Sequence, residues 1–136
     1  MVEDDEAVRG FLCRALESGA YVPMPVRTGE EALSVLRSAH PAAVLIDGIL
    51  PDMHGVRLAN EILADPQGAD TAICFVTGAI RESVAATAGV TALSKPLRIA
   101  ELLTCLEALM QWRQTGSPVE ERLETLRTLE QGFLVR

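Results

Sequence analysis

Short apolar runs that end in a polar residue recur along this chain, and they constrain its fold more than any other feature. The runs AAVLID (42–47), TAICFVTG (71–78) and VTALSKP (90–96) carry no charge before their closing residues, which is typical of strands buried on both faces. Stretches with apolar residues at helical spacing separate these runs. Strands that alternate with helices in this way predict a parallel sheet covered by helices on both faces.

The complete pattern predicts five strands and six helices. A strand with two prolines at 22–26 suits a sheet edge, and the first strand is reduced to Met1 and Val2. Right-handed crossovers then leave only a few doubly wound strand orders. Helices are expected at 5–18, 28–40, 56–65, 97–112 and 118–131, and a short one at 79–89.

Charge and composition exclude several functions. The net charge of −7 and the pI of about 4.8 argue against direct binding of nucleic acid or of an anionic membrane. Cys13, Cys74 and Cys105 lie far apart within apolar runs and are interpreted as reduced core residues. Because the sequence shows neither a signal peptide nor an apolar run of membrane-spanning length, we expect a cytoplasmic protein without a membrane segment.

Polar side chains stand where the predicted strands end. Glu3 and Asp4 follow the first strand, Asp47 the third, Thr77 the fourth and Lys95 the fifth. In doubly wound sheets, ligands bind outside the carboxyl ends of the strands. Three carboxylates in one crevice would repel one another unless a cation lay among them, and oxygen ligands suit Mg²⁺. A carboxylate nucleophile, a metal, a lysine and a hydroxyl together indicate a phosphoryl-transfer site.

These motifs appear in a fixed order: the acidic pair in VEDDE, Asp47 in VLIDGILPDMHG, Thr77 in FVTG, and Lys95-Pro96 in SKPL. Over residues 1 to about 112, the chain resembles the receiver domain of two-component response regulators. The resemblance implies a flavodoxin-like fold with strand order 2-1-3-4-5. It also implies that a sensor histidine kinase transfers a phosphoryl group to Asp47, and that the domain signals by protein contact.

The resemblance assigns a role to each site residue. Asp4 is expected to bind Mg²⁺ directly, Glu3 to hold a water of the metal, and Ile49 to lend the metal its backbone carbonyl. Thr77 and Lys95 are expected to contact the phosphoryl oxygens. Such a domain catalyses only its own phosphorylation and dephosphorylation, so we expect a signalling phosphoacceptor and not a metabolic enzyme.

The sequence also departs from the family pattern. The stretch from Thr77 to Lys95 is about one helical turn short, and Ala92 stands where the family has an aromatic residue. The family further implies a cis bond before Pro96. The short stretch and the missing aromatic residue favour an alternative, an interaction module of receiver fold that signals without phosphorylation. A phosphohydrolase is a weaker alternative, because Ile49 stands where such enzymes carry a second acid.

The sequence divides into a receiver domain (1–112), a linker (113–117) and a C-terminal helical extension (118–136). The extension carries a narrow apolar stripe that is typical of a helix pair: Val119, Leu123, Leu126, Leu129 and Phe133. The stripe is expected to pair with another chain, for example in a homodimer, or with an adjoining domain; packing on its own domain is the alternative. An output domain or partner would bind this helix or the face made by the fourth helix, fifth strand and fifth helix. Residues 1–136 contain no predicted DNA-recognition helix, so the sequence does not predict direct DNA binding.

Overall fold

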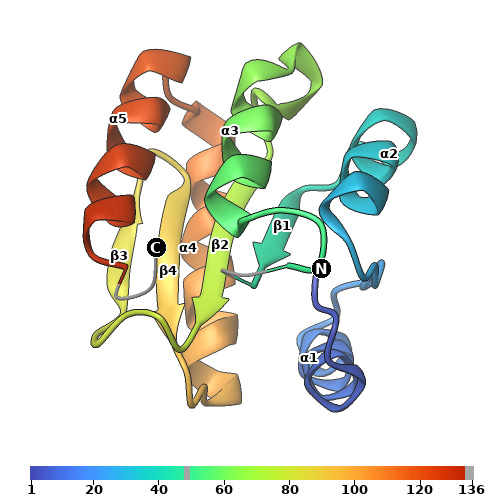
Figure 1. The fold of residues 1–136 in the computed structure, drawn as a ribbon. Coiled ribbons are helices and arrows are strands. Elements are labelled where there is room, and N and C mark those ends of the chain that lie inside the picture. The colour runs from blue at the N-terminus through green and yellow to red at the C-terminus, as the bar shows by residue number, and fades with distance from the viewer. Residues whose placement is uncertain (48–49, 134–136) are drawn as a thin grey trace.

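A twisted sheet runs through the middle of the molecule, and helices cover both of its faces (Figure 1). The structure is a computed structural model that describes residues 1–47 and 50–133, apart from the side chains of residues 85 and 86. Within this part of the chain, four strands lie in the order β1-β2-β4-β3. Their bounds are Ala43–Ile46 (β1), Ala72–Thr77 (β2), Val84–Thr87 (β3) and Val90–Ser94 (β4).

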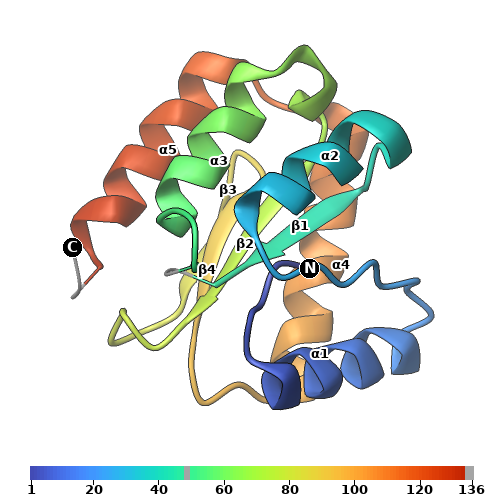
Figure 2. The same ribbon diagram turned by 45° about the vertical axis from the view of Figure 1, so that its right-hand side comes forward.

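The helices lie in two layers. Helices α1 and α4 cover one face of the sheet, whereas α2, α3 and α5 cover the other (Figures 1 and 2). The helices span Glu6–Ser18 (α1), Gly29–Ala39 (α2), Gly55–Ala64 (α3), Ile99–Thr115 (α4) and Val119–Gln131 (α5), with a short 3₁₀ turn at Pro66–Gly68 (η1). Asp5 caps α1, because its carboxylate accepts the N–H of Val8 at 3.0 Å. The helix predicted at residues 5–18 is therefore confirmed.

The predicted spatial order of the strands is confirmed, but two of the five predicted strands are reduced to single residues. Val2 forms one parallel bridge to Val26 and another to Ile46. The predicted first and second strands thus lie where the order 2-1-3-4-5 requires them, without forming extended ladders. The prolines at 23 and 25 precede the paired residue Val26 and cannot donate N–H groups to a ladder. Strands β1, β2 and β4 are parallel, as predicted.

The helix predicted at 79–89 is wrong, because this segment contains the strand β3, which pairs antiparallel with β4. Ala88 and Gly89 connect the two strands with positive φ angles of 53° and 71°, the backbone of a tight hairpin turn. Gly89 is required there, since a Cβ atom would lie 2.6 Å from the ring of Trp112. Hairpin geometry and β-branched residues such as Val84 outweigh the weak helical spacing of this segment.

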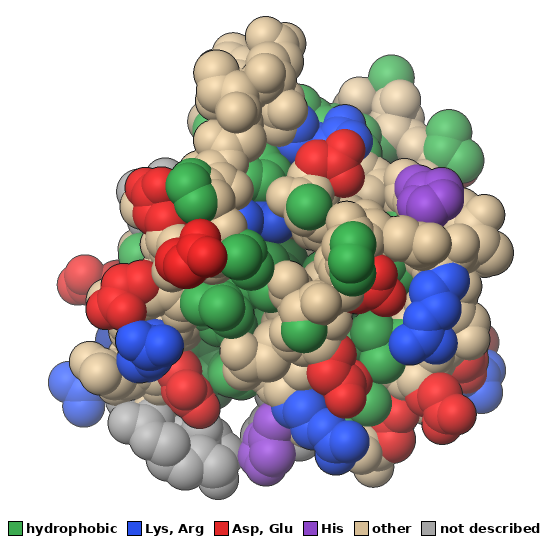
Figure 3. Space-filling view, turned by 90° about the horizontal axis from the view of Figure 1, so that it is seen from above, with side chains coloured by type: hydrophobic (Ala, Val, Ile, Leu, Met, Phe, Trp, Pro, Cys, Tyr) green, Lys and Arg blue, Asp and Glu red, His purple; other side chains and the backbone are tan. Residues whose placement is uncertain are grey.

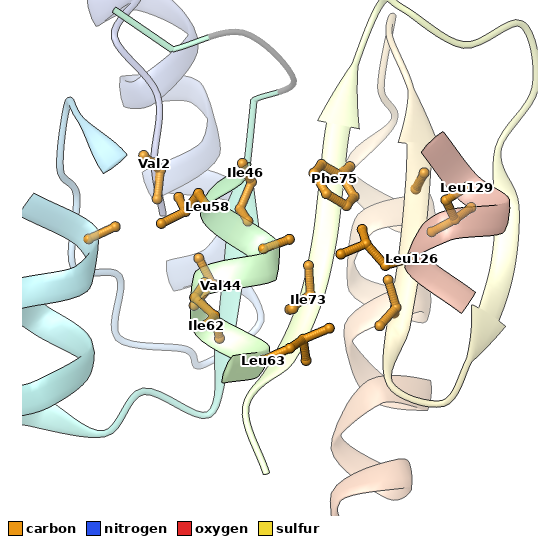
Figure 4. Packing of buried hydrophobic residues seen from close by; sticks show 14 of the residues in the cluster. Val2, Val44, Ile46, Leu58, Ile62, Leu63, Ile73, Phe75, Leu126 and Leu129 are labelled. Carbon is orange, nitrogen blue, oxygen red and sulfur yellow. The ribbon is translucent and has the colours of Figure 1, made fainter. Parts of the chain in front are cut away.

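Helix α5 covers the part of the sheet that the predicted crossover helix would have covered. It lies beside α3 and packs on β3 and β4 (Figure 2). Leu126 and Leu129 are buried beside Phe75 of the sheet (Figure 4). Phe133 and Ala92 belong to the same buried cluster. Most of the apolar stripe therefore packs on its own domain, and the prediction that it pairs with another chain is wrong for these residues. A homodimer through another surface stays a prediction.

A buried arginine fastens the start of α5 to the rest of the fold. The Arg122 side chain is 1% exposed, and its guanidinium lies 4.4 Å from the centre of the Trp112 ring. It donates hydrogen bonds to the carbonyls of Gly68, Ala69, Thr71, Ala88 and Gly89. Burial lowers the pKa of Arg122 to about 10, so the side chain stays charged at neutral pH.

The junction between the two predicted domains is more regular than the sequence indicates. Helix α4 continues to Thr115, so residues 113–115 of the predicted linker are helical. Gly116 then turns the chain with a φ of 70° toward α5. The boundaries 1–112, 113–117 and 118–136 stay a prediction.

We expect Arg122→Met to lower the free energy of unfolding by roughly 3 kcal/mol. The substitution leaves several buried carbonyls without a donor, and each costs about 1–3 kcal/mol unless it finds another partner. Urea denaturation followed by the fluorescence of Trp112 measures the loss. Arg127→Met is the control on the same helix, because Arg127 is exposed and its loss should change stability by less than about 0.5 kcal/mol. Equal effects of the two substitutions would contradict the anchoring role of Arg122.

Candidate functional site

Three carboxylates converge at the carboxyl end of the parallel strands. Glu3, Asp4 and Asp47 each offer an oxygen, and these three oxygens lie within 4.8 Å of one another. The bridge at Val2 brings them together, since its N–H donates to the carbonyl of Leu45 at 2.7 Å and its carbonyl accepts the N–H of Asp47 at 3.1 Å. The structure thus places Asp47 beside two acids, Glu3 and Asp4, that lie more than forty residues before it in the sequence.

Glu3 is the most buried of the three acids. Its side chain is 4% exposed, one carboxylate oxygen accepts the N–H of Asp5 at 3.2 Å, and the other lies 3.3 Å from the ammonium of Lys95. Burial raises the pKa of Glu3, and the charge of Asp47 raises it further, whereas the Asp5 N–H and Lys95 lower it. The pKa is raised overall, mainly because burial disfavours the charged form of the carboxylate.

Lys95 and Thr77 come from adjacent strand ends. The backbone N–H of Lys95 donates to the carbonyl of Thr77 at 2.9 Å, and the bond between Lys95 and Pro96 is cis, as the resemblance implied. Thr77 is 3% exposed, and its hydroxyl accepts the N–H of Ala79 at 3.0 Å. The structure therefore brings a hydroxyl and an ammonium to the edge of the sheet that carries the acids.

Two residues that the sequence analysis missed hold the surrounding backbone. The guanidinium of Arg9 donates to the carbonyls of Glu3 (3.0 Å) and Asp4 (3.3 Å), one turn into the helix that follows them. The carboxylate of Asp52 accepts two N–H groups at the start of α2, at 3.0 and 3.1 Å, and these bonds lower its pKa. The sequence signals that could have identified these two residues were an arginine in the first turn of α1 and an acid in the loop after Asp47.

The donor set fits a hard divalent cation. All three groups present carboxylate oxygens, which Mg²⁺ prefers, and their mutual repulsion favours a bound cation. Ile49, whose carbonyl was expected to join them, lies outside the described residues. The opposite end of the strands looks different: acidic and basic side chains are interspersed there (Figure 3).

An α/β fold whose parallel strands end at three acids, a threonine and a lysine is the architecture of a phosphoacceptor domain. Comparison with known proteins agrees. Residues 1–107 match the family described as response regulator receiver domain, and the chain belongs to that family. It is therefore a receiver domain, the phosphoacceptor module of two-component signal transduction.

Curated relatives include two response regulators named MprA. The chain is 33% identical over 117 residues to MprA of Mycolicibacterium vanbaalenii, covering 82% of this chain and 49% of that protein. It is 32% identical to MprA of Mycobacterium ulcerans over 117 residues, with the same coverage. The chain thus spans about half the length of these relatives.

Solved structures confirm the fold class. A CheY-like response regulator receiver domain from Methylobacillus flagellatus superposes with a TM-score of 0.67 and 25% identity, over 79% of this chain and 93% of that one. A putative response regulator from Chloroflexus aurantiacus gives a TM-score of 0.72 and 25% identity, over 81% of this chain and 93% of that one.

Within the described residues, no helix is both long and apolar enough to cross a bilayer.

We expect Lys95→Met to destabilise the protein by about 1–2 kcal/mol at pH 7.5 and by less at pH 5. Glu3 then lacks its countercharge, so its pKa rises further above the unfolded value of about 4.3. The folded state then binds the Glu3 proton more tightly than the unfolded state does. The destabilisation is therefore largest at high pH, where Glu3 must be charged, and it shrinks as Glu3 becomes protonated.

Urea denaturation at the two pH values, without divalent cations, measures this effect. Arg127→Met is the control, because it removes the partner of an exposed pair with Glu124. A loss for Lys95→Met that does not change between pH 5 and pH 7.5 would show that Glu3 is not the group involved.

Proposed function

We propose that Asp47 is the residue that accepts the phosphoryl group, and that the donor is a phosphohistidine of a sensor histidine kinase. The observation that carries this proposal is the position of Asp47: half-buried at the end of β1, with carboxylate oxygens of Glu3 and Asp4 within 4.8 Å. A carboxylate oxygen of Asp47 attacks the phosphorus. The new P–O bond forms as the P–N bond breaks, and the leaving imidazole keeps the electron pair of that bond.

Lys95 and Thr77 would stabilise the new negative charge. The ammonium of Lys95 is now held at 3.3 Å by Glu3, and a phosphoryl group on Asp47 would compete for it. The Thr77 hydroxyl already accepts the N–H of Ala79, which leaves its own proton available for a phosphoryl oxygen. Attack of water on the phosphorus later releases phosphate and returns Asp47 to a carboxylate.

Glu3, Asp4 and Asp47 would hold Mg²⁺, which when bound would offset the charge of the acids and of the phosphoryl oxygens. Within this set, the exposed Asp4 is the most accessible ligand, and the buried Glu3 is held in place by the N–H of Asp5. A role for the Ile49 carbonyl stays a prediction.

The output face differs from the one that the resemblance implies. Strand β3 and helix α5 replace the expected fourth helix, so the corresponding surface is made by β3, β4 and α4. We propose that an output domain or partner protein contacts this surface or α5. The same change in the output face supports the alternative, a receiver-fold module that signals without phosphorylation. The acceptor site itself keeps every expected side chain that the structure describes.

We expect the chain to gain one phosphoryl group when incubated with MgCl₂ and acetyl phosphate. Intact mass spectrometry measures the gain, and Asp47→Asn should abolish it. Asp52→Asn is the matched control from the same loop: its carboxylate caps α2, so this variant should still be phosphorylated. Loss of phosphorylation in neither variant would exclude Asp47, and no phosphorylation of the native chain would favour the non-phosphorylated module.

We expect Asp4→Asn to weaken Mg²⁺ binding at least about tenfold, which corresponds to ~1.4 kcal/mol. The substitution removes a charged ligand at an exposed position, so the fold should be unaffected. Isothermal titration with MgCl₂ measures the change. Asp5→Asn removes the same charge one residue later, while asparagine still caps α1, and its affinity should stay close to that of the native chain. Equal weakening by both substitutions would indicate an unspecific charge effect.

A further inference from the structure

The C-terminal end of α5 lies beside the strand that carries Thr77. Phe133, just past the helix, is 6% exposed, and its ring meets that of Phe75 edge to face, with centroids 5.3 Å apart and planes at 85°. Phe75 precedes Thr77 by two positions on β2, so the two side chains point to the same face of the sheet. Phe133 therefore packs on the face, and near the edge, at which Thr77 stands.

The loop that follows Thr77 is tied into the same packing. Its N–H at Ala79 donates to the Thr77 hydroxyl at 3.0 Å, and the carbonyl of Ile80 accepts the Ser94 hydroxyl at 3.4 Å. Ile80 is buried in the cluster that contains Phe75 and Phe133. Because packed cores change between discrete arrangements and do not deform continuously, this loop cannot shift far without repacking the aromatic pair.

Helix α5 is fastened independently at its other end. Arg122 binds carbonyls in the turns at residues 68–71 and 88–89, which lie toward the amino ends of β2 and β4. The helix can thus stay attached through Arg122 when the packing around Phe133 changes. Its two ends contact different parts of the domain, and only the Phe133 end is near the carboxylates.

We propose that Phe133 is a positioning residue that couples the docking of α5 to the state of Asp47. Packed against Phe75, it holds the 77–80 loop in the arrangement of the unphosphorylated protein. A phosphoryl group on Asp47 that draws the Thr77 hydroxyl inward releases the last turn of α5, which carries the signal to the C-terminal side of the domain. The coupling rests on the proposed role of Asp47. It is reciprocal, so removing the Phe133 ring must favour a phosphoryl group at Asp47.

Binding of beryllofluoride, a non-covalent analogue of the phosphoryl group, tests the coupling in the full chain with MgCl₂. Phe133→Ala should bind it at least about fivefold more tightly than the native chain, the lower end of measured couplings between sites. Phe133→Leu keeps most of the apolar volume and should restore native affinity. Val119→Ala removes an exposed apolar side chain of α5 and is the control without effect. Titration calorimetry measures the affinities, and urea denaturation shows that each variant is folded.

Hydrogen exchange provides a second readout that a purely structural role would not change. Beryllofluoride should accelerate exchange of the amides of residues 129–133 in the native chain and leave those of residues 120–124, near Arg122, protected. Unchanged or weaker binding by Phe133→Ala, or unchanged exchange at 129–133, overturns the coupling alone. A native chain that binds no beryllofluoride overturns the role of Asp47, and the coupling with it.

Discussion

The site depends on one residue, Val2, which joins the start of the chain to the sheet. Its side chain is 1% exposed, and its backbone bridges Val26 on one side and Ile46 on the other. These bridges set the position of Glu3 and Asp4 relative to Asp47, since Val2 directly precedes Glu3 and its carbonyl accepts the N–H of Asp47 itself. A contact this short can suffice because Arg9 and Asp5 hold the backbone on the helical side.

Covering the sheet is the second constraint, and the chain meets it unusually. The segment between β2 and β4 forms the hairpin strand β3 and leaves Phe75, Val90 and Ala92 without a crossover helix above them. Helix α5 buries these side chains instead. Burial of apolar surface does not depend on the direction of the contact, so any apolar helix face that can reach the sheet can serve. The connection through Gly116 and the anchor at Arg122 let α5 reach it.

Much of the fold followed from sequence patterns. Strands β1, β2 and β4 were predicted because their apolar runs are unbroken, and α1 because apolar residues recur at helical spacing between residues 8 and 16. The segment 79–89 was mispredicted because short apolar runs suit a helix or a strand equally, and its antiparallel partner decides between them. Arg9 and Asp52 were missed, because their partners are backbone groups, which no residue pattern marks. The raised pKa of Glu3 depends on burial, which is likewise a property of the folded chain.

The sequence by itself determined the chemistry of this protein: which residues end the strands, and hence that acids, a hydroxyl and a lysine share one edge. It could do so because parallel strands separated by helices place their carboxyl ends together, whatever the details of packing. Only the tertiary structure decided what α5 does. The apolar stripe from Val119 to Phe133 indicates that this helix must pack against another surface. The free energy gained by burying the stripe depends on the area removed from water and not on which surface covers it. The uncovered face of β2, β3 and β4 was the nearest such surface, and it placed Phe133 beside Phe75.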